Sequence, residues 1–338
     1  MRWTQHPIVR MCSVRVRFGA TSSSAGDRMR TRPHESRNRG PGDYRTEQTM
    51  KQATVIGLGQ MGSTLAQLLL DGGYRVTVWN RSAGKADLVA NGAVLAPSAA
   101  AAIAASPVIV VCVHNYVATR AILALDGVAG ALAGKLLIQL STGGVQEARD
   151  LEAWLRDQGS AYLDGAIQAA PSQMGRADTP ILLSGAEPTF REQEALLRVF
   201  GGGLSYLGED AGAASAMDMA TLSYIYGAAI GFFHGARIAE SAGFRVDQYG
   251  ALVAGIGPTL TDFLKYEGDV IQSGDFKVGE SPLKISIEAT ERIAQAARDT
   301  GINDEFPSFV SGLFQRAADA GYGDEEVAAI IKVLRGKQ

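Results

Sequence analysis

ATVIGLGQMGSTLAQLLLD, residues 53–71, joins an apolar run to a helical pattern through three spaced glycines. The spacing G-x-G-x-x-G, directly after a strand and at the start of a helix, is typical of a loop that binds a dinucleotide pyrophosphate. Gly57 permits the tight turn, Gly59 lets the phosphates approach the backbone, and Gly62 lets the helix pack closely on the sheet. The helix N-terminus would face the pyrophosphate with free N–H groups. We therefore predict a cofactor loop of Gly57, Leu58, Gly59, Gln60, Met61 and Gly62.

Short apolar runs and helical patterns alternate from Ala53 to about Gly208. This repetition predicts crossover connections and a mainly parallel sheet, and continuous apolar runs are typical of strands buried on both faces. We assign residues 50–209 to an α/β domain with a Rossmann-type, doubly wound parallel sheet. The expected strands are Ala53–Ile56, Arg75–Trp79, Val108–Val113, Leu136–Leu140, Ala161–Asp164 and Ile181–Ser184, and the expected helices are Gln60–Asp71, a helix capped by Ser98 that runs to Ala105, and Val145–Gln158.

The end of the second strand distinguishes an NAD site from an NADPH site. An NAD site places Asp or Glu here to bind the ribose 2′-OH, whereas this chain has Trp79-Asn80-Arg81-Ser82, with Lys85 one turn on. Arg81 can stack on adenine and pair with a 2′-phosphate, Ser82 can donate a hydrogen bond, and Lys85 adds positive charge. The alternative is a solvated basic turn. The pattern favours NADPH, bound here through Asn80, Arg81, Ser82 and Lys85.

Two further loops follow apolar strands at the edge where open α/β sheets bind ligands. Val113, His114 and Asn115 lie at the end of the strand expected at Val108–Val113, and Ser141 opens the loop of residues 141–144 after the strand expected at Leu136–Leu140. These four residues are candidates to contact the nicotinamide end of the cofactor. Each loop is also an ordinary strand-to-helix turn in which Asn or Ser caps the helix, and both interpretations stay open.

The pattern changes after Glu209, and residues 210–338 are predicted to form an all-helical domain. From Gly212 to Phe233 the only formally charged residue is Asp218. A membrane span would need a similar length, but the central Asp and the preceding nucleotide domain favour a long interdomain helix buried by other protein. Such a helix needs more cover than short helices give, so we expect dimerisation. The expected helices after it are Val246–Gly255, Pro258–Gln272, Leu283–Asp299, Glu305–Ala320 and Asp324–Leu334.

Asp218 is the strongest candidate for proton chemistry. A lone carboxylate on a buried helix is costly unless it is paired or protonated, and apolar surroundings raise its pKa in the way that suits a proton donor. If ionised, it would instead attract a cationic substrate. Tyr226, two turns later on the same helix, could line the edge of the same cleft. The alternative is a buried Asp bonded to backbone or water.

Composition excludes other classes of partner. The net charge is −3, but residues 1–49 hold ten arginines and four acidic residues, which leaves 22 basic and 31 acidic residues from Met50 onward. A net charge near −9 from Met50 onward argues against nucleic acid or an anionic membrane as partner.

Residues 1–49 lack an amphipathic period and are expected to be a disordered extension or to precede the natural start at Met50; a transit peptide is the alternative. The two cysteines lack metal or redox spacing, which predicts a reducing, cytoplasmic setting and no metal site.

Four segments resemble those of the imine reductase and reductive aminase family, a branch of the 6-phosphogluconate and β-hydroxyacid dehydrogenase group. The resemblance spans almost the whole chain from Met50 onward. The first segment is shared across that group, and the other three are more specific to imine reductases. They are VIGLGQMGSTLAQLLLDGGYRVTVWNRS (55–82), YLDGAIQAAPSQMG (162–175), LSGAEPTF (183–190) and YLGEDAGAASAMDMATLSYIYG (206–227).

The resemblance implies roles for three residues. Asp218 matches the proposed proton donor, Tyr226 matches a residue that binds or protonates substrate in the aminating members, and Asn115 matches one near the nicotinamide and substrate. It also implies a homodimer with interdigitated helical domains, in which each active site lies between one subunit's nucleotide domain and the other's helices.

Departures from the wider group narrow the substrate. Hydroxyacid dehydrogenases carry Lys on this helix with Asn four residues later, where this chain has Asp218 and Leu222. Their Gly-Gly, which grips the substrate carboxylate, is replaced here by Ala169-Ala170-Pro171. Both changes argue against a hydroxy acid. The pocket aromatic of aminating members has no clear counterpart beyond Phe263, so imine reduction is favoured over reductive amination.

We therefore expect NADPH-dependent reduction of C=N bonds in a small imine, or in a carbonyl and amine pair. The alternatives are a β-hydroxyacid dehydrogenase-like oxidoreductase acting on carbonyls and alcohols, and a cofactor-binding regulator without turnover.

Overall fold

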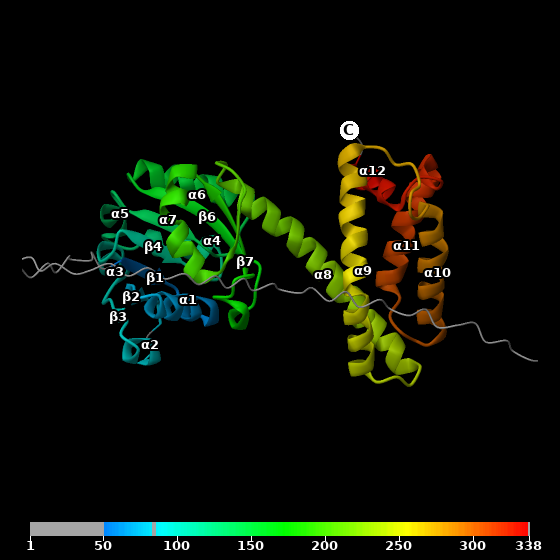
Figure 1. Ribbon diagram of the computed structural model, residues 1–338, viewed down its shortest axis with the longest axis horizontal. Helices are drawn as coiled ribbons and strands as arrows, with labels where there is room; N and C mark the ends of the chain where they lie inside the picture. The colour runs from blue at the N-terminus through cyan, green and yellow to red at the C-terminus, as the bar shows by residue number, and fades with distance from the viewer. Residues whose placement is uncertain (1–50, 83–85, 337–338) are drawn as a thin grey trace, which may run out of the picture. The chain divides into compact units, whose positions relative to one another are not determined.

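The computed structural model describes residues 51–82 and 86–336. The expectations placed on residues 1–49, and the one placed on Lys85, lie outside these residues. An eight-stranded sheet with its helices comes first in the described chain, and a set of helices follows it (Figure 1). The predicted succession of an α/β region and a helical region is confirmed.

The sheet has the strand order β3-β2-β1-β4-β5-β6-β7-β8. Neighbouring strands are parallel except for β6 and β7, which pair antiparallel. Because β1 lies between β2 and β4, the direction of winding reverses there, and such a switch point is where doubly wound sheets bind ligands. The strands are β1 (Gln52–Ile56), β2 (Arg75–Trp79), β3 (Val94–Leu95), β4 (Val108–Val111), β5 (Leu136–Gln139), β6 (Ala161–Ile167), β7 (Pro180–Gly185) and β8 (Gly203–Tyr206).

Helices bury both faces of the sheet. On β4, Val108 and Val110 join an apolar cluster with α1 and α7, whereas Ile109 and Val111 join a second cluster with α3, α4, α5 and α6. This alternation explains why β4 reads as an uninterrupted apolar run. The helices of this region are α1 (Gln60–Asp71), α2 (Ala86–Ala90), α3 (Ala99–Ala104), α4 (Tyr116–Leu123), α5 (Val128–Ala131), α6 (Val145–Asp157) and α7 (Glu187–Phe200), with a 3-10 turn at Pro171–Gln173.

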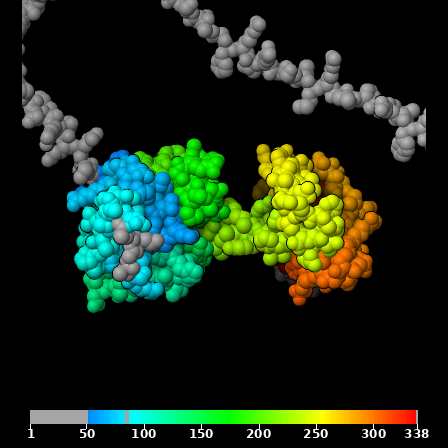
Figure 2. All heavy atoms as spheres, turned by 90° about the horizontal axis from the view of Figure 1, so that it is seen from below, coloured from blue at the N-terminus to red at the C-terminus, as the bar shows by residue number. Residues whose placement is uncertain are grey.

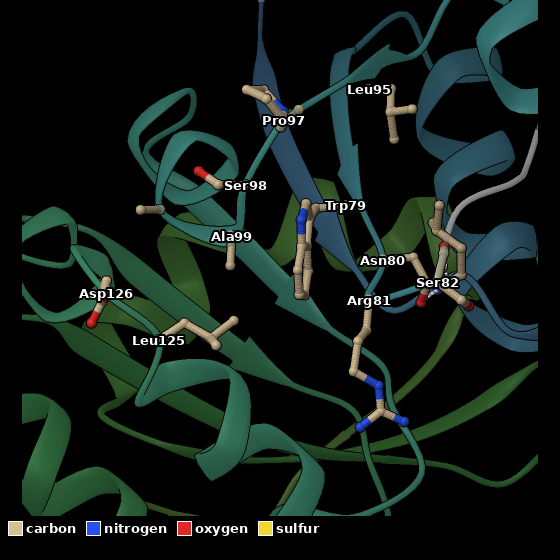
Figure 3. A pocket seen from close by; sticks show the side chains of 13 residues that line it. Trp79, Asn80, Arg81, Ser82, Leu95, Pro97, Ser98, Ala99, Leu125 and Asp126 are labelled. Atoms are coloured by element: carbon tan, nitrogen blue, oxygen red, sulfur yellow. Dashed lines mark hydrogen bonds between the residues drawn. The ribbon is translucent and has the colours of Figure 1, made fainter.

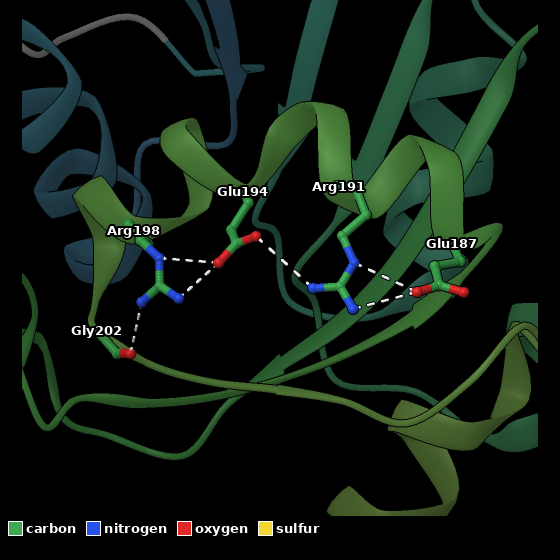
Figure 4. A network of polar contacts seen from close by, with 5 residues as sticks. All are labelled: Glu187, Arg191, Glu194, Arg198 and Gly202. Carbon is green, nitrogen blue, oxygen red and sulfur yellow. Dashed lines mark hydrogen bonds and ion pairs between the residues drawn. The ribbon is translucent and has the colours of Figure 1, made fainter.

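The sequence pattern did not predict α7, which follows β7 and packs apolar residues against the sheet. Its outer side carries a row of ion pairs from Glu187 through Arg191 and Glu194 to Arg198, whose guanidinium also donates to the Gly202 carbonyl at 3.2 Å (Figure 4). Exposed pairs of this kind contribute little each, roughly 0.3–0.5 kcal/mol. The helix therefore depends on its buried face rather than on these charges.

The helical region contains long helices joined by tighter turns. Its helices are α8 (Gly212–Ser241), α9 (Val246–Ser273), α10 (Leu283–Asp299), α11 (Glu305–Ala317) and α12 (Ile331–Leu334), with a π turn at Ala318–Tyr322 and a 3-10 turn at Val327–Ile330. Two predictions were wrong here. Residues 246–273 form one helix rather than two, because Pro258 removes only its own N–H bond while its neighbours keep helical geometry. The last helical turns begin at Val327 rather than Asp324, because the Glu326 carboxylate accepts the Val327 N–H and caps them.

Most of α8 beyond Asp218 is exposed in the single chain (yellow-green in Figure 2). Tyr224, Tyr226, Ile230 and Phe233 each keep more than half of their surface accessible. The predicted burial of this helix is thus not achieved by one chain. Among the described helices, none is long and apolar enough to cross a membrane.

Candidate active site

Each glycine of the cofactor loop meets a different constraint. Gly57 has a φ of +94°, and a Cβ there would lie 2.2 Å from the Cys112 carbonyl oxygen. At Gly62 a Cβ would lie 1.9 Å from the Gly57 carbonyl oxygen, so the helix could not sit so close to the loop. A Cβ at Gly59 would meet nothing within 4 Å. Gly59 therefore borders open space, which a bound group can occupy.

The first turn of α1 has the character of an anion site. Gly59 is the residue before the helix and makes no side-chain cap, and the first turn has no acidic residue. The first backbone N–H groups of a helix carry a partial positive charge when no side chain satisfies them. A pyrophosphate fits this end of α1 without displacing a protein group.

Asn80 connects the end of β2 to the cofactor loop. Its Oδ1 accepts from the Leu58 backbone N–H at 3.2 Å, and its Nδ2 donates to the Ser82 carbonyl and hydroxyl oxygens at 3.1 and 3.0 Å. Arg81 lies between these anchored positions and its side chain is exposed at the edge of a hollow (Figure 3). Within residues 51–82 and 86–336 no hydrogen bond or ion pair engages the Arg81 guanidinium, so it can bind a phosphate from this position.

Two adjoining hollows meet at Trp79, Asn80, Arg81 and Ser82. One of about 680 Å³ runs from this turn along the cofactor loop to Cys112, Val113 and His114; the other, of about 620 Å³, extends toward the start of α3. The indole of Trp79 lies beside Ala99, between the side formed by Ala99 and Leu125 and the turn of Asn80 and Arg81 (Figure 3). The larger hollow follows the path that an extended dinucleotide would take across the switch point.

The two loops near the expected nicotinamide end differ from the cofactor loop. Val113 and His114 line the larger hollow, but Asn115 and Ser141 are not among its lining residues. Asn115 caps α4 by accepting the Ala118 N–H at 2.9 Å, and the Ser141 hydroxyl accepts the Val113 N–H at 2.9 Å. The latter bond takes Val113 out of the strand ladder, so β4 ends at Val111 instead of Val113. The predicted helix-cap role is therefore confirmed for Asn115 and wrong for Ser141, because α6 begins after Gly144 and the Ser141 hydroxyl binds β4's end instead. Contact of either residue with a cofactor stays a prediction.

Asp218 is buried in the second turn of α8, where 5% of its surface is accessible. Burial raises the pKa of its carboxyl above the usual range, and a hydrogen bond from Gln168 opposes part of that rise. Gln168 was not predicted as a site residue. It follows β6 within the quoted segment 162–175, but it reaches Asp218 only because α8 packs against β6.

A second buried carboxyl, Asp164 on β6, has no counterpart among the predicted site residues. It accepts hydrogen bonds from the hydroxyls of Tyr116, Tyr162 and Ser215, the last at 2.8 Å. Burial raises its pKa to about 6 despite these hydrogen bonds, which lower it. The cluster connects α4, β6 and α8, since Tyr116 begins α4 next to Asn115 and Ser215 lies one turn before Asp218.

Family models cover both regions of the chain. The model described as the NAD binding domain of 6-phosphogluconate dehydrogenase matches residues 52–208, and the one described as NADPH-dependent reductive aminase-like, C-terminal domain, matches residues 210–336. An NADPH-dependent reductive aminase from Aspergillus oryzae is 30% identical over 84% of this chain and 97% of its own length. The chain belongs to the imine reductase and reductive aminase family.

Solved structures of the same family agree. An imine reductase from Myxococcus stipitatus in complex with NADP+ matches 84% of this chain and 99% of its own, with a TM-score of 0.80 and 32% identity. A reductive aminase from Aspergillus terreus in complex with NADPH and ethyl levulinate matches the same shares, with a TM-score of 0.79 and 35% identity. The family resemblance inferred from sequence is thus confirmed.

In this member of the imine reductase family, the predicted residues form separate groups. The glycine loop, Asn80, Arg81 and Ser82 share one groove with Val113 and His114. Asp218 is held by Gln168, whereas Tyr226, two turns later on α8, has 67% of its surface accessible. No hydrogen bond between the described residues joins Tyr226 to Asp218. A complete site that uses both residues needs further groups around α8.

Proposed function

We propose that this protein is an NADPH-dependent oxidoreductase that reduces C=N bonds. The observation that carries the proposal is that one chain contains both a groove suited to a dinucleotide, ending at Arg81, and a buried carboxyl, Asp218, on the first long helix after the sheet. The family supports the cofactor half, since its solved members include complexes with NADP+ and NADPH. We assign the cofactor to residues 50–209 and the substrate and dimer contacts to residues 210–338.

The chain's own groups would hold the cofactor in a defined order. The uncapped N-terminus of α1 binds the pyrophosphate, and Gly59 leaves room for it. Arg81, Ser82 and Lys85 bind the 2′-phosphate, with Asn80 fixing the turn that carries the first two. When bound, NADPH supplies a hydride from its nicotinamide ring to the imine carbon.

Asp218 supplies the proton. A carboxyl whose pKa is raised by burial keeps its proton closer to neutral pH than an exposed Asp would. Transfer of that proton to the imine nitrogen leaves a carboxylate beside an iminium cation, and the two charges attract in a water-poor cleft. Tyr226 orients the substrate or relays the proton. A carboxyl in this position suits a basic nitrogen better than the carboxylate of a hydroxy acid.

A second copy of the chain would complete the site. The exposed apolar residues of α8 include Tyr224, Ile225, Ile230 and Phe233, and a helix that exposes so many large apolar side chains is typical of a subunit interface. We infer a homodimer with interdigitated helical domains, which would enclose Tyr226. Sedimentation at micromolar concentration should show a dimer, and Phe233→Asp should shift it toward monomer. A monomer at all concentrations contradicts this arrangement. The cytoplasmic location remains a prediction.

A substrate panel tests the proposed reaction. NADPH oxidation would be followed with a small cyclic imine, with a ketone and a primary amine together, and with an aldehyde alone, and NADP+ reduction would be followed with β-hydroxy acids. We expect the cyclic imine to give the highest kcat/KM. Preference for hydroxy acids would favour the dehydrogenase alternative, and absence of turnover with every compound would favour a cofactor-binding regulator.

A further inference from the structure

Gln168 connects the end of β6 to Asp218 and has no part in the proposed function. Its Nε2 donates to Asp218 Oδ1 at 2.5 Å, and its Oε1 accepts from the Thr221 hydroxyl at 2.9 Å. We propose that Gln168 is a positioning residue that holds one oxygen of Asp218 and leaves the other for the substrate nitrogen. This inference rests on the proposed function, because it assumes that Asp218 is the proton donor.

The two carboxyl oxygens of Asp218 differ in their hydrogen bonds. Oδ1 is occupied by Gln168, whereas no hydrogen bond within residues 51–82 and 86–336 uses Oδ2. Oδ2 is also not one of the fully buried polar atoms without a partner, so it keeps accessible surface. A carboxyl held in this way has one oxygen to bind the substrate and one that is fixed by the protein.

Two side chains of the β6 segment fix the rotation of α8 that this arrangement needs. Asp164 and Gln168 are four residues apart and thus on the same face of an extended chain, and they contact Ser215 and Asp218, which are three apart on one face of a helix. One contact alone would allow α8 to turn about it. The pair determines which way Asp218 points.

Thr221 fixes the orientation of the Gln168 amide. Its hydroxyl lies within hydrogen-bond distance of Gln168 Oε1 and of the Met217 and Asp218 carbonyl oxygens, and its single proton can serve one of them well. When it serves Gln168, the amide nitrogen faces Asp218. The reversed amide would place two oxygens against each other once Asp218 is ionised, which is unfavourable.

The Gln168 bond matters most after the proton has left Asp218. A hydrogen bond to an ionised carboxylate is stronger than one to a neutral carboxyl. Gln168 therefore stabilises the anion that proton transfer creates and makes Asp218 a better acid than burial alone would allow. Loss of such a bond corresponds to a fall in rate of roughly tenfold to a hundredfold.

A double-mutant cycle tests the proposal with the full chain. Gln168→Met, Asp218→Ala and the double variant would be compared for kcat and KM with a small cyclic imine, and for NADPH affinity by cofactor fluorescence. We expect Gln168→Met to lower kcat roughly tenfold to a hundredfold, with NADPH affinity unchanged. In the Asp218→Ala background the same substitution should change kcat by less than about twofold, because the coupled partner is gone.

A matched pair at Thr221 gives a second reading if Gln168→Met does not fold. Thr221→Ser keeps the hydroxyl and should retain kcat, whereas Thr221→Val removes it and should lower kcat in the same direction as Gln168→Met. Equal losses from Gln168→Met in both backgrounds, or equal activity of the two Thr221 variants, would show that Gln168 acts only on the fold and overturn the proposal. Absence of imine turnover by the unaltered chain would instead refute the proposed function.

Discussion

Asp164→Asn should remove a specific pH dependence of folding. The pKa of Asp164 is about 6 in the folded chain against an ordinary value of 3.8, and burial causes the rise. Because the folded pKa is raised, the carboxyl contributes stability that is fully present below the ordinary value and is lost as pH rises through about 6. The difference of about two pH units corresponds to a loss of about 3 kcal/mol. Asn keeps an acceptor for Tyr116 and Tyr162 and a donor toward Ser215, but it does not titrate.

Urea unfolding at fixed protein concentration measures this effect. Relative to Asp164→Asn, the unaltered chain should lose about 2–3 kcal/mol of unfolding free energy between pH 4 and pH 7. Asp210→Asn is the control, since Arg149 lowers the pKa of Asp210 to about 2 and its folded-state titration lies below this range. A constant difference between the unaltered chain and Asp164→Asn across these pH values would refute the assignment of a raised pKa to this cluster.

Three other comparisons test the groove and the proton donor. Arg81→Ala should raise the KM for NADPH roughly tenfold to a hundredfold and that for NADH far less, since it removes a charge-assisted phosphate contact. Arg75→Ala, at the other end of the same strand, should change neither KM. An unchanged NADPH preference in Arg81→Ala would contradict the cofactor assignment. Gly62→Ala should lower Tm because its Cβ would lie 1.9 Å from a carbonyl oxygen, whereas Gly59→Ala should leave Tm unchanged and weaken NADPH binding; equal Tm losses would argue against the distinction. With imine substrate, kcat/KM should fall as pH rises through the raised pKa of Asp218, and this ionisation should be absent in Asp218→Asn; its persistence there would assign it to another group.

Features that depend on local backbone constraints could be read from the sequence. The geometry of the glycine loop was predictable because a Cβ at Gly57 or Gly62 would meet backbone atoms, whereas a Cβ at Gly59 would meet nothing within 4 Å. The helix after Ser98 was predictable because the Ser98 hydroxyl accepts the Ala101 N–H, as an N-cap should. The apolar run of β4 was predictable because both of its faces are buried.

Features that depend on pairing between distant segments could not be read in this way. Asp164 and Gln168 meet Ser215 and Asp218 only because β6 lies beside α8, and a separation of about 50 residues leaves no periodic signal. The antiparallel pairing of β6 with β7 was not predicted either, because an apolar strand pattern does not specify the direction in which the strand runs. At Pro258 the local signal gave a wrong prediction: proline usually ends a helix, but here the helix continues through it.

NADPH oxidation with a small cyclic imine, by the unaltered chain and by Asp218→Ala at equal NADPH occupancy, tests the central claim most directly. We predict clear turnover by the unaltered chain and a fall in kcat of at least roughly a hundredfold in Asp218→Ala, as expected for loss of a general acid. Undiminished kcat in Asp218→Ala would contradict the account, because the buried carboxyl on α8 would then have no part in the reaction.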